Sequence, residues 1–369
     1  MVDNKHRRKP RRTPKKEAHG RNTSLSNFVN PEEDYASEKK SYESGAIDFA
    51  DGSVFCPKCG RQDEVIERGV RKTKFRGDIQ RYGCKRCRIR FLNEPFAHTW
   101  FPDWVYERVL EDAVNGLKDS QIAKNVNSEA IRRKENVKIS SKTVINIKER
   151  AVEILWEFEL RAPRKEKAAV WQIDDTPQPY SKKNEIDQKT RNDSADSKKE
   201  EWRFAWITNV LEEDDRYCLA QVTSEDRIAT NSESAIRLAL LRAKYGPQLV
   251  KCDGYKGHVK GVKAVLKHVE VDSRTKKEDY GHINRIERYH QTIRSLALKK
   301  RRHFRSIQSL NITAELVRLY YNFMRPHKSL NGMPPAKKAG IEYPYHEGLT
   351  WLELIRFAFV FLRKQRNSI

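Results

Sequence analysis

Long apolar runs are missing from this 369-residue sequence, and the absence of any run of about 18 hydrophobic residues excludes a bilayer-spanning helix. The opening residues, MVDNKHRRKPRRTPKK, also lack the apolar stretch of a secretory signal. We therefore expect a cytoplasmic or nucleoid protein of a prokaryote, nuclear if the host is eukaryotic, with no membrane partner. Hydrophobic residues make up only 37% of the chain, yet seven Trp, 14 Tyr and 14 Phe exclude wholesale disorder. The length suggests about two or three folded units.

Acidic residues are scarce relative to basic ones, since 51 Asp and Glu accompany 74 Lys and Arg, a net charge of +23. The surplus is uneven: 12 basic residues accompany 7 acidic ones at 46–100, and 17 accompany 5 at 281–369, whereas 101–160 is nearly neutral. Such a surplus favours a polyanion partner, most often nucleic acid, although a solvated surface explains any single basic run equally well. Residues 1–45 lack apolar periodicity and are predicted to be a disordered basic arm.

Cysteine is also sparse, but four of the six residues form two closely spaced pairs, Cys56 with Cys59 and Cys84 with Cys87. Four thiolates in two such pairs complete a closed tetrahedral zinc site, and the segment between them is long enough for a hairpin. We therefore predict a zinc ribbon at 46–100 with a structural ion. Two disulfides or redox pairs are the alternative, which a chain without a secretory signal makes less favourable.

Residues 101–162 have the helical periodicity of a helix-turn-helix module. A helix is expected from Asp103 to about residue 115, a short one at 121–125, and a long one from residue 140 or 141 to about 159. The start of the last helix would then present its side chains to the major groove of DNA. These residues are Ser141, Lys142, Thr143 and Asn146. A helical spacer with a purely structural role is the alternative.

Three carboxylates stand at informative places in the following α/β segment, which is predicted as β-β-β-α-β-α-β-α. Asp174 and Asp253 end apolar strands, and Glu287 lies on a later helix. Carboxylates that converge in this way can hold two divalent ions about 3.5–4 Å apart and clamp a phosphodiester. Mg²⁺, or Mn²⁺ in its place, suits such oxygen ligands. Each acid taken alone is more simply a surface residue or a helix cap.

Three motifs resemble those of DDE transposases and integrases, above all the compact insertion-sequence transposases of bacteria and archaea. They are WQIDDT at 171–176, KCDG at 251–254 and NRIERYHQTIR at 284–294, and 321–336 is similar to the closing YN-x-x-RPH signature of that family. The resemblance covers roughly 165–342 and implies a ribonuclease-H-like catalytic domain at 163–342. Two features depart from the family pattern: Asp175 follows Asp174 where Glu is commoner, and a charged insertion at about 181–201 enlarges the first hairpin.

The resemblance implies a multidomain transposase that binds the ends of a transposable element as double-stranded DNA. It would cut the 3′ ends and transfer them into target DNA at one metal site, held by Asp174, Asp253 and Glu287. Joining two ends calls for a homodimer or higher oligomer. Further DNA contacts are expected on and after the Glu287 helix, where a solvated surface is the alternative. These residues are Asn284, Arg288, His290, Arg294, Lys299, Lys300, Arg301 and Arg302.

The segment at 343–369 is predicted to contain a helix that covers the core or forms a dimer. In the closing signature, Arg325 and His327 are expected to pack against the catalytic layer rather than take part in the chemistry. Two alternatives remain for the whole chain: a DNA-binding regulator with a catalytically inactive transposase domain, and a plain nuclease on the same fold. The intact acidic triad disfavours the first, and the closing signature and the ribbon disfavour the second.

Overall fold

The computed structural model describes residues 54–73, 77–96, 101–165, 168–181, 202–275, 282–298, 300–301 and 304–365. The predicted basic arm lies outside these residues, as does the charged insertion apart from Ser181, the last residue of its strand. None of the helices in the described ranges has both the length and the apolar character needed to cross a membrane.

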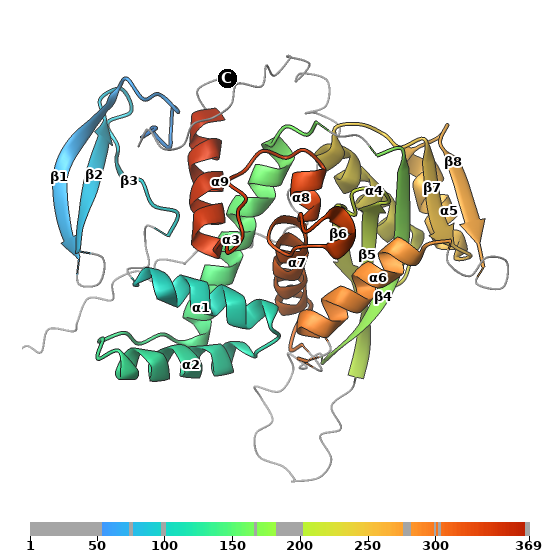
Figure 1. Cartoon of the computed structure of the whole chain (residues 1–369), viewed down its shortest axis with the longest axis horizontal. Coiled ribbons are helices and arrows are strands. Elements are labelled where there is room, and N and C mark those ends of the chain that lie inside the picture. The colour runs from blue at the N-terminus through green and yellow to red at the C-terminus, as the bar shows by residue number, and fades with distance from the viewer. Residues whose placement is uncertain are drawn as a thin grey trace, which may run out of the picture. The chain divides into compact units, whose positions relative to one another are not determined.

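A small antiparallel sheet of order β1-β2-β3 comes first (Figure 1). Its strands are β1 (Val65–Thr73), β2 (Gly77–Cys84) and β3 (Arg90–Leu92). The β1–β2 hairpin occupies the segment between the two cysteine pairs, as a ribbon requires. Tyr82 and Phe91 are register partners on β2 and β3, and their rings stack with centroids 6.0 Å apart. Aromatic pairs across strands stabilise so small a sheet.

Three helices follow: α1 (Asp103–Val114), α2 (Asp119–Arg132) and α3 (Ser141–Arg161). The start of α3 agrees with prediction, because the Ser140 hydroxyl accepts a hydrogen bond from the Thr143 amide in a capping box. The predicted length of the second helix is wrong. It continues to Arg132 because Val126 and Ala130 extend the face that Ile122 buries.

The second sheet is mixed and has the order β6-β5-β4-β7-β8. Its strands are β4 (Val170–Ser181), β5 (Trp202–Glu212), β6 (Cys218–Ser224), β7 (Leu249–Asp253) and β8 (Glu270–Arg274). Strands β4, β5 and β6 pair antiparallel, whereas β7 pairs parallel with β4 and with β8. The order of strands and helices follows the prediction, and this topology is that of a ribonuclease-H-like core.

Helices cover both faces of this sheet. They are α4 (Ala229–Ala243), α5 (Lys256–Val265), α6 (Asn284–Ile293), the π-helical turn η3 (Arg294–Leu298), α7 (Ile307–Phe323), the 3₁₀ turn η4 (Lys328–Leu330), α8 (Pro335–Lys338) and α9 (Trp351–Gln365). One face, with Ile207 and Leu211, packs against α6, η3 and α7. The other face, with Trp171 and Ile173, belongs to a larger core that includes α4 and reaches into α1, α2, α3 and α9.

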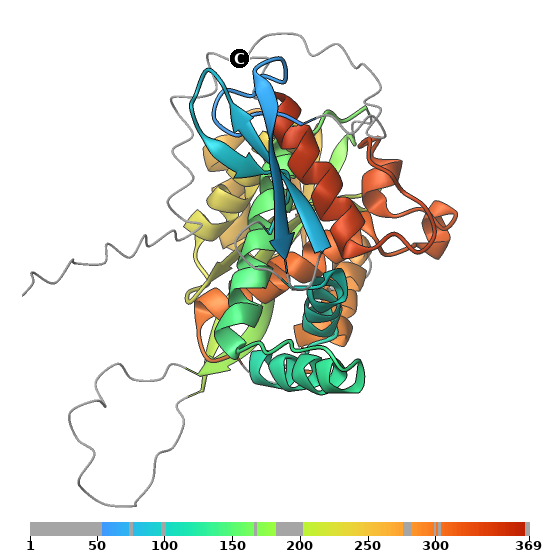
Figure 2. The same cartoon turned by 90° about the vertical axis from the view of Figure 1, so that its left-hand side faces the viewer.

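Helix α9 lies along α3 in both views of the fold (Figures 1 and 2). The Phe158 ring of α3 meets the rings of Phe357 and Phe361 edge-on, with centroids 5.6 and 5.1 Å apart. The Arg363 guanidinium of α9 also donates hydrogen bonds to the Asn93 side chain and the Leu92 carbonyl beside the ribbon. Of the two predicted roles for this tail, these contacts are those of a helix that covers the core.

A buried ionic cluster joins α3 to the five-stranded sheet. Glu159 of α3 accepts a hydrogen bond of 2.8 Å from the Arg318 guanidinium of α7, which also donates to Glu315 and to the Cys218 carbonyl of β6. Arg242 of α4 lies 3.5 Å from the same Glu159 carboxylate. Glu159, Arg318 and Arg242 are each 2% exposed or less, so their charges are satisfied by one another rather than by water. The second half of α3 therefore shares one core with the five-stranded sheet.

Candidate active site

The register of two parallel strands brings Asp174 and Asp253 together. Ile173 of β4 pairs with Cys252 of β7, and both side chains are fully buried. The next residue on each strand is an aspartate, so the two carboxylates leave the paired region at the same edge of the sheet. The prediction that Asp174 ends its strand is wrong, because β4 continues to Ser181 by pairing with β5, but its parallel pairing with β7 ends just before Asp174.

His258 completes this acidic group. Ligand atoms of Asp174, Asp253 and His258 all lie within 4.8 Å of one another. The imidazole of His258, on α5, is completely buried, and its Nδ1 is 2.8 Å from the Ser232 hydroxyl of α4. Its Nε2 lies 3.4 Å from Asp175 Oδ2 and 3.6 Å from Asp253 Oδ1, and has no hydrogen-bond partner of good geometry in the described chain. Two carboxylates and a buried nitrogen without a partner are a donor set that fits a divalent cation.

Asp175 has a different environment from Asp174. The Thr208 hydroxyl and the Arg227 guanidinium donate to its two carboxylate oxygens at 2.6 and 2.7 Å. Its side chain is 3% exposed, whereas that of Asp174 is 14% exposed. Arg227 also reaches Asp253 Oδ2 at 3.3 Å. Because Asp175 is fully engaged inside the protein, Asp174 is the better candidate for a metal ligand.

His290 orients Asp174 from helix α6. Its Nδ1 lies 3.4 Å from Asp174 Oδ2, and its Nε2 lies 3.1 Å from the Asn209 amide nitrogen on β5. Burial alone would raise the pKa of Asp174, but the hydrogen bond and charge of His290 and the Asp175 amide outweigh it and lower that pKa. The prediction that His290 contacts DNA from the helix surface is wrong. The imidazole is 2% exposed because it faces the sheet.

Glu287 lies in the first turn of α6, one turn before His290. The start of this helix is fixed against β4 by a 2.9 Å hydrogen bond from the Ile286 amide to the Gln172 side chain. Glu287 is partly buried but is not within the 4.8 Å group of Asp174, Asp253 and His258 among the described residues. The structure thus brings two of the predicted carboxylates together and places the third beside them on the helix.

The other predicted DNA contacts on α6 differ in exposure. Asn284 and Arg288 are exposed. Arg294 is also exposed, and its Nε donates to the Thr176 hydroxyl at 2.8 Å, two residues beyond Asp174. These three side chains therefore remain accessible to a polyanion, and Arg294 lies on the side of the acidic group.

The predicted basic stripe at 299–302 is not a continuous surface. Lys299 and Arg302 lie outside the described residues, and Lys300 is exposed. Arg301 is 7% exposed, and its guanidinium donates to Asp119 and to the Thr313 hydroxyl. A phosphate contact from Arg301 is therefore a wrong prediction. The π-helical turn η3 widens the helix just before it, so the 3.6-residue periodicity of α6 no longer applies.

The first turn of α3 carries the residues predicted to read DNA bases. Lys142 and Asn146 are exposed, whereas Ser141 and Thr143 are partly buried. The Thr143 hydroxyl takes part in the capping box, since the Ser140 amide donates to it at 3.4 Å. Lys142 and Asn146 are therefore the freer of the four side chains.

The four paired cysteines gather at one point of the ribbon. Their sulfur atoms all lie within 4.8 Å of one another, and the sulfurs of Cys59 and Cys84 are 3.7 Å apart. A tetrahedral zinc ion with Zn–S bonds of about 2.3 Å requires an S–S separation of about 3.8 Å, whereas a disulfide requires about 2.05 Å. All six cysteines are free thiols. The geometry fits zinc and excludes the disulfide alternative.

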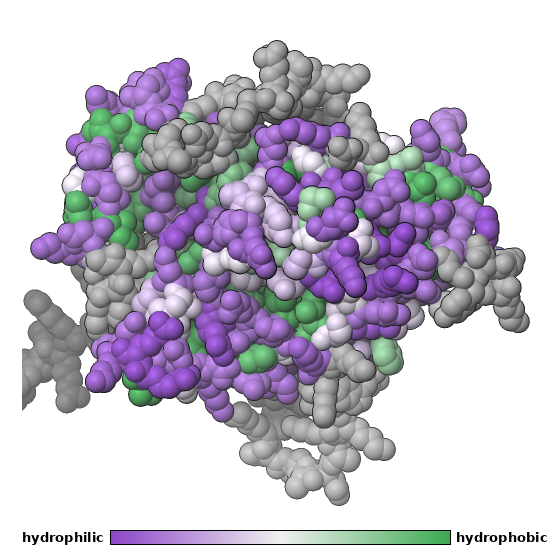
Figure 3. Space-filling view, viewed as in Figure 1, coloured by the Kyte–Doolittle hydropathy of each residue, from purple (hydrophilic) through white to green (hydrophobic). Residues whose placement is uncertain are grey.

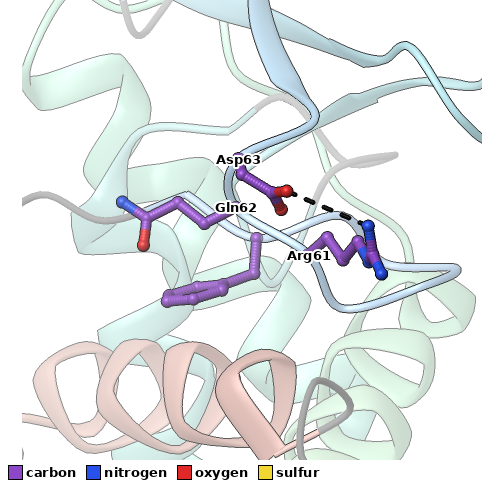
Figure 4. Close-up of a pocket in the computed structure, with 4 residues that line it drawn as sticks. Arg61, Gln62 and Asp63 are labelled. Carbon is purple, nitrogen blue, oxygen red and sulfur yellow. Dashed lines mark ion pairs between the residues drawn. The ribbon is translucent and has the colours of Figure 1, made fainter.

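A hollow of about 630 Å³ lies beside the first cysteine pair (Figure 4). Arg61 and Asp63 point toward one another there, with 3.9 Å between nitrogen and oxygen. Their side chains are 49% and 71% exposed, and ion pairs of this kind contribute only about 0–1 kcal/mol. With no buried polar group in its lining, this hollow is a feature of the surface rather than a second site.

Sequence reasoning missed Arg227 and His258. His258 carries a recoverable signal, because it follows Asp253 by five residues on a helix whose buried face includes Val262, one turn later. Arg227 carries none, since it lies between β6 and α4 and reaches the site only through the fold. The sequence predicted a functional role for His290, but it did not predict that the imidazole points toward Asp174.

Comparison with known proteins identifies one part of the chain directly. Residues 283–335 match the family model "Integrase core domain", and this range contains Glu287, His290 and the closing signature. No curated protein matches the sequence.

Three solved structures are among those to which the chain is similar. A chain of a simian T-cell lymphotropic virus intasome in complex with the PP2A regulatory subunit B56 gamma is 9% identical, with 57% of this chain and 70% of that chain covered and a TM-score of 0.34. The catalytic core domain of BIV integrase is 12% identical, with 47% and 94% covered and a TM-score of 0.30. The Mos1 mariner paired end complex with Mn is 13% identical, with 73% and 77% covered and a TM-score of 0.26. Scores this low establish no correspondence between individual residues.

The family match, the mixed five-stranded sheet and the aspartates at its edge point in the same direction. Each was found independently of the others: one in the sequence of 283–335, one in the pairing of strands and one in the side-chain geometry. Residues 283–335 are thus similar to an integrase core, and they pack against the mixed sheet that carries the two aspartates.

Proposed function

We propose that this protein is a transposase that binds the ends of a DNA transposable element, cleaves their 3′ ends and joins them to target DNA. The observation that carries the proposal is the meeting of Asp174, Asp253 and His258 at the carboxyl edge of two parallel strands, with α6 alongside. Glu287 belongs to the segment that matches the integrase core, and we propose it as the third carboxylate. Movement of its side chain toward the two aspartates would complete the group.

The chain's own residues prepare this site for phosphodiester chemistry. His290 holds one oxygen of Asp174, and the Asp175 amide donates to the other at 2.8 Å. Arg227 bridges Asp175 and Asp253 at the entrance. Two bound Mg²⁺ ions, or Mn²⁺, would supply Lewis acidity to the attacking and leaving oxygens. The acidic edge would otherwise repel a DNA strand, and Arg294 and Asn284 are placed to position it.

The other modules fit DNA recognition. We propose a structural zinc ion on Cys56, Cys59, Cys84 and Cys87. We also propose that α2 and α3 act as a helix-turn-helix, in which Lys142 and Asn146 make the main base-edge contacts. Two element ends require two active sites, so a homodimer or higher oligomer is proposed for the synaptic complex.

The test compares cleavage and joining of element ends by the wild type and by Asp253→Asn in Mg²⁺ and in Mn²⁺. Asp63→Asn in the ribbon is the matched control, because its side chain is 71% exposed and far from the catalytic sheet in sequence. We expect Asp253→Asn to lose both steps and to bind Mn²⁺ more weakly by electron paramagnetic resonance, while Asp63→Asn keeps both. Equal activity of Asp253→Asn and wild type would contradict the metal assignment.

Substrates that are already cut distinguish the remaining functions. A transposase joins a pre-cut 3′ end to a second duplex, a plain nuclease cleaves but does not join, and an inactive regulator binds ends without either reaction. Glu287→Gln, with Glu233→Gln on α4 as its control, tests the third carboxylate. Full activity of Glu287→Gln would remove that residue from the proposed site.

A further inference from the structure

A basic groove lies on the flank of α6 away from the acidic site. It has a volume of about 870 Å³ and is lined by one stripe of α6 and η3, by the β5–β6 turn and by the loop after α7. We call it the α6 groove and define it by its cations and one histidine. These are Arg216, Arg285, Arg288, Arg325, Lys328 and His327. The surface over α6 is hydrophilic on the face shown in Figure 3.

The positive charge of the α6 groove is uncompensated. No acidic residue lines it, and none of its five cationic side chains has a carboxylate partner in the described part of the chain. Burial, together with the charges of Arg285 and Arg288, lowers the pKa of Arg216. Burial and the charges of Arg325 and Arg216 lower the pKa of His327 to about 4. Cations that repel one another in this way favour an anionic ligand.

The closing signature builds one wall of the groove. Asn322 pins the end of α7 to β6, because its side chain both accepts from and donates to the backbone of Cys218 at 3.0 Å. The loop then folds back, with the Gly332 amide bonded to the His327 carbonyl and Gly332 at a φ of +79°. This loop presents Arg325 and Lys328 to the groove. His327 is 6% exposed, and its Nε2 has no partner among the described residues.

Arg216 provides a second, independent indication. It sits in the tight β5–β6 turn at a φ of +59°, a left-handed conformation that suits Gly or Asn and costs another residue about 1–2 kcal/mol. Its partly buried side chain has no ion pair in the described part of the chain and lies among the other cations of the groove.

We propose that the α6 groove binds the phosphate backbone of a DNA strand that runs past the active site. The inference rests on the proposed function and adds a second contact region to it. The α6 stripe from Arg285 to Ser295 covers eleven residues, or about 15 Å from first to last, which matches about four phosphates at 3.4 Å per nucleotide. Gln291, Thr292 and Ser295 add uncharged hydrogen-bonding groups along the stripe.

The position of α6 explains how one strand reaches both regions. His290 of α6 contacts Asp174, and Arg288 of the same helix lines the groove, so a single helix of about 10–12 Å diameter separates the two regions. That width corresponds to roughly three nucleotides of a strand. A phosphate held by Arg288 or Arg285 would thus fix the register of the bond presented to Asp174 and Asp253.

The test measures the salt dependence of DNA binding. Arg216→Gln/Arg325→Gln removes two charges of the groove from outside α6. Lys263→Gln/Lys267→Gln, which removes two exposed charges in and just after α5, is the control. Fluorescence anisotropy with a 30-base-pair duplex is recorded over a range of KCl. Each lost phosphate contact lowers the slope of log K against log salt by about 0.9. We expect the groove variant to lose about 2 in slope and ten- to hundredfold in affinity near 0.1 M salt, and the control to lose neither.

Two further arms keep the result interpretable. Arg216→Lys/Arg325→Lys keeps the charge and should retain most of the slope, with thermal unfolding as a check on folding. The second experiment uses the wild-type protein and DNA that carries uncharged methylphosphonate linkages. These linkages are placed in the terminal duplex of the element in one sample and in an arbitrary duplex in the other. A loss of affinity for the modified terminal duplex alone assigns the groove to the element end, and a loss for the modified arbitrary duplex alone assigns it to target DNA.

An unchanged slope of log K against log salt in the glutamine variant, or equal binding of native and methylphosphonate DNA, would contradict the proposal that the α6 groove binds phosphates. If Asp253→Asn still abolishes Mg²⁺-dependent cleavage in that case, the proposed function stands without it. If the wild type neither binds nor cuts DNA, both proposals fail together.

Discussion

Replacing Arg318 by Met should destabilise the protein severely, because it removes the main counter-charge of a fully buried carboxylate. Burial raises the pKa of Glu159, but the charges of Arg318 and Arg242 outweigh it and lower that pKa from its ordinary 4.5 to about 2. A difference of this size corresponds to about 3 kcal/mol. Breaking a buried pair from one side typically costs about 3–5 kcal/mol, so the two figures agree.

The assay is urea denaturation at pH 7 followed by circular dichroism. We expect Arg318→Met to lose about 3–5 kcal/mol of unfolding free energy. Arg237→Met, which breaks the half-exposed pair with Glu233 on α4, is the matched control and should lose less than about 1 kcal/mol. A loss below 1 kcal/mol for Arg318→Met would refute the reasoning, since it would mean that Glu159 is adequately satisfied by Arg242 and the Tyr217 hydroxyl.

Acid provides an independent measurement of the same cluster. Because the pKa of Glu159 is depressed in the folded state, its contribution is fully present above about pH 4.5 and is lost as the pH falls toward 2. The difference in stability between wild type and Glu159→Gln should therefore shrink over that interval. A difference that stays constant between pH 5 and pH 2 would show that the carboxylate is not ionised in the folded protein.

Three further predictions concern the ribbon, the site and the core. Wild-type protein should hold one zinc ion by elemental analysis, and Cys84→Ser should hold none and exchange the amide hydrogens of β1–β3 rapidly. His290→Gln should weaken Mn²⁺ binding about 10- to 100-fold with little change in melting temperature, because Asp174 loses its orienting partner; an unchanged affinity would remove that role. Gly116→Ala should lower the free energy of unfolding by about 1–3 kcal/mol in thermal unfolding, because Gly116 has a φ of +83° and the new Cβ would lie 2.8 Å from the Ala297 carbonyl oxygen. Equal stability would mean that the turn can shift.

Much of the catalytic fold was predictable because local patterns were consistent with one another. The apolar runs before Asp174 and Asp253 predicted the two strands, although β4 continues past Asp174 to Ser181, and the cysteine spacing predicted a ribbon. These features depend on a few consecutive residues. The length of α2 was mispredicted because its later apolar residues are small and widely spaced among polar ones.

Side chains that act across the fold were harder to predict. Arg301 looked like part of a basic surface stripe, yet its guanidinium is bound to Asp119, 182 positions earlier in the chain. Glu212 and Asp215, at the turn between β5 and β6, are likewise buried against Arg164. Charge patterns in a sequence do not distinguish a solvated residue from one half of a buried pair, because the partner is supplied by tertiary structure.

The continuity of α3 has a mechanical consequence. This helix has 21 residues and is therefore about 31 Å long. Its N-terminal part carries the proposed base-reading residues, and its last turns are anchored to α7 and β6 by the buried ion pairs and hydrogen bonds around Glu159. Because α3 is continuous and its C-terminal end is fixed, its N-terminal end cannot rotate independently of the five-stranded sheet. On the proposed function, α3 would fix the distance between the recognised bases and the cut bond, so bringing two element ends together would require the DNA to bend or the whole protomer to rotate.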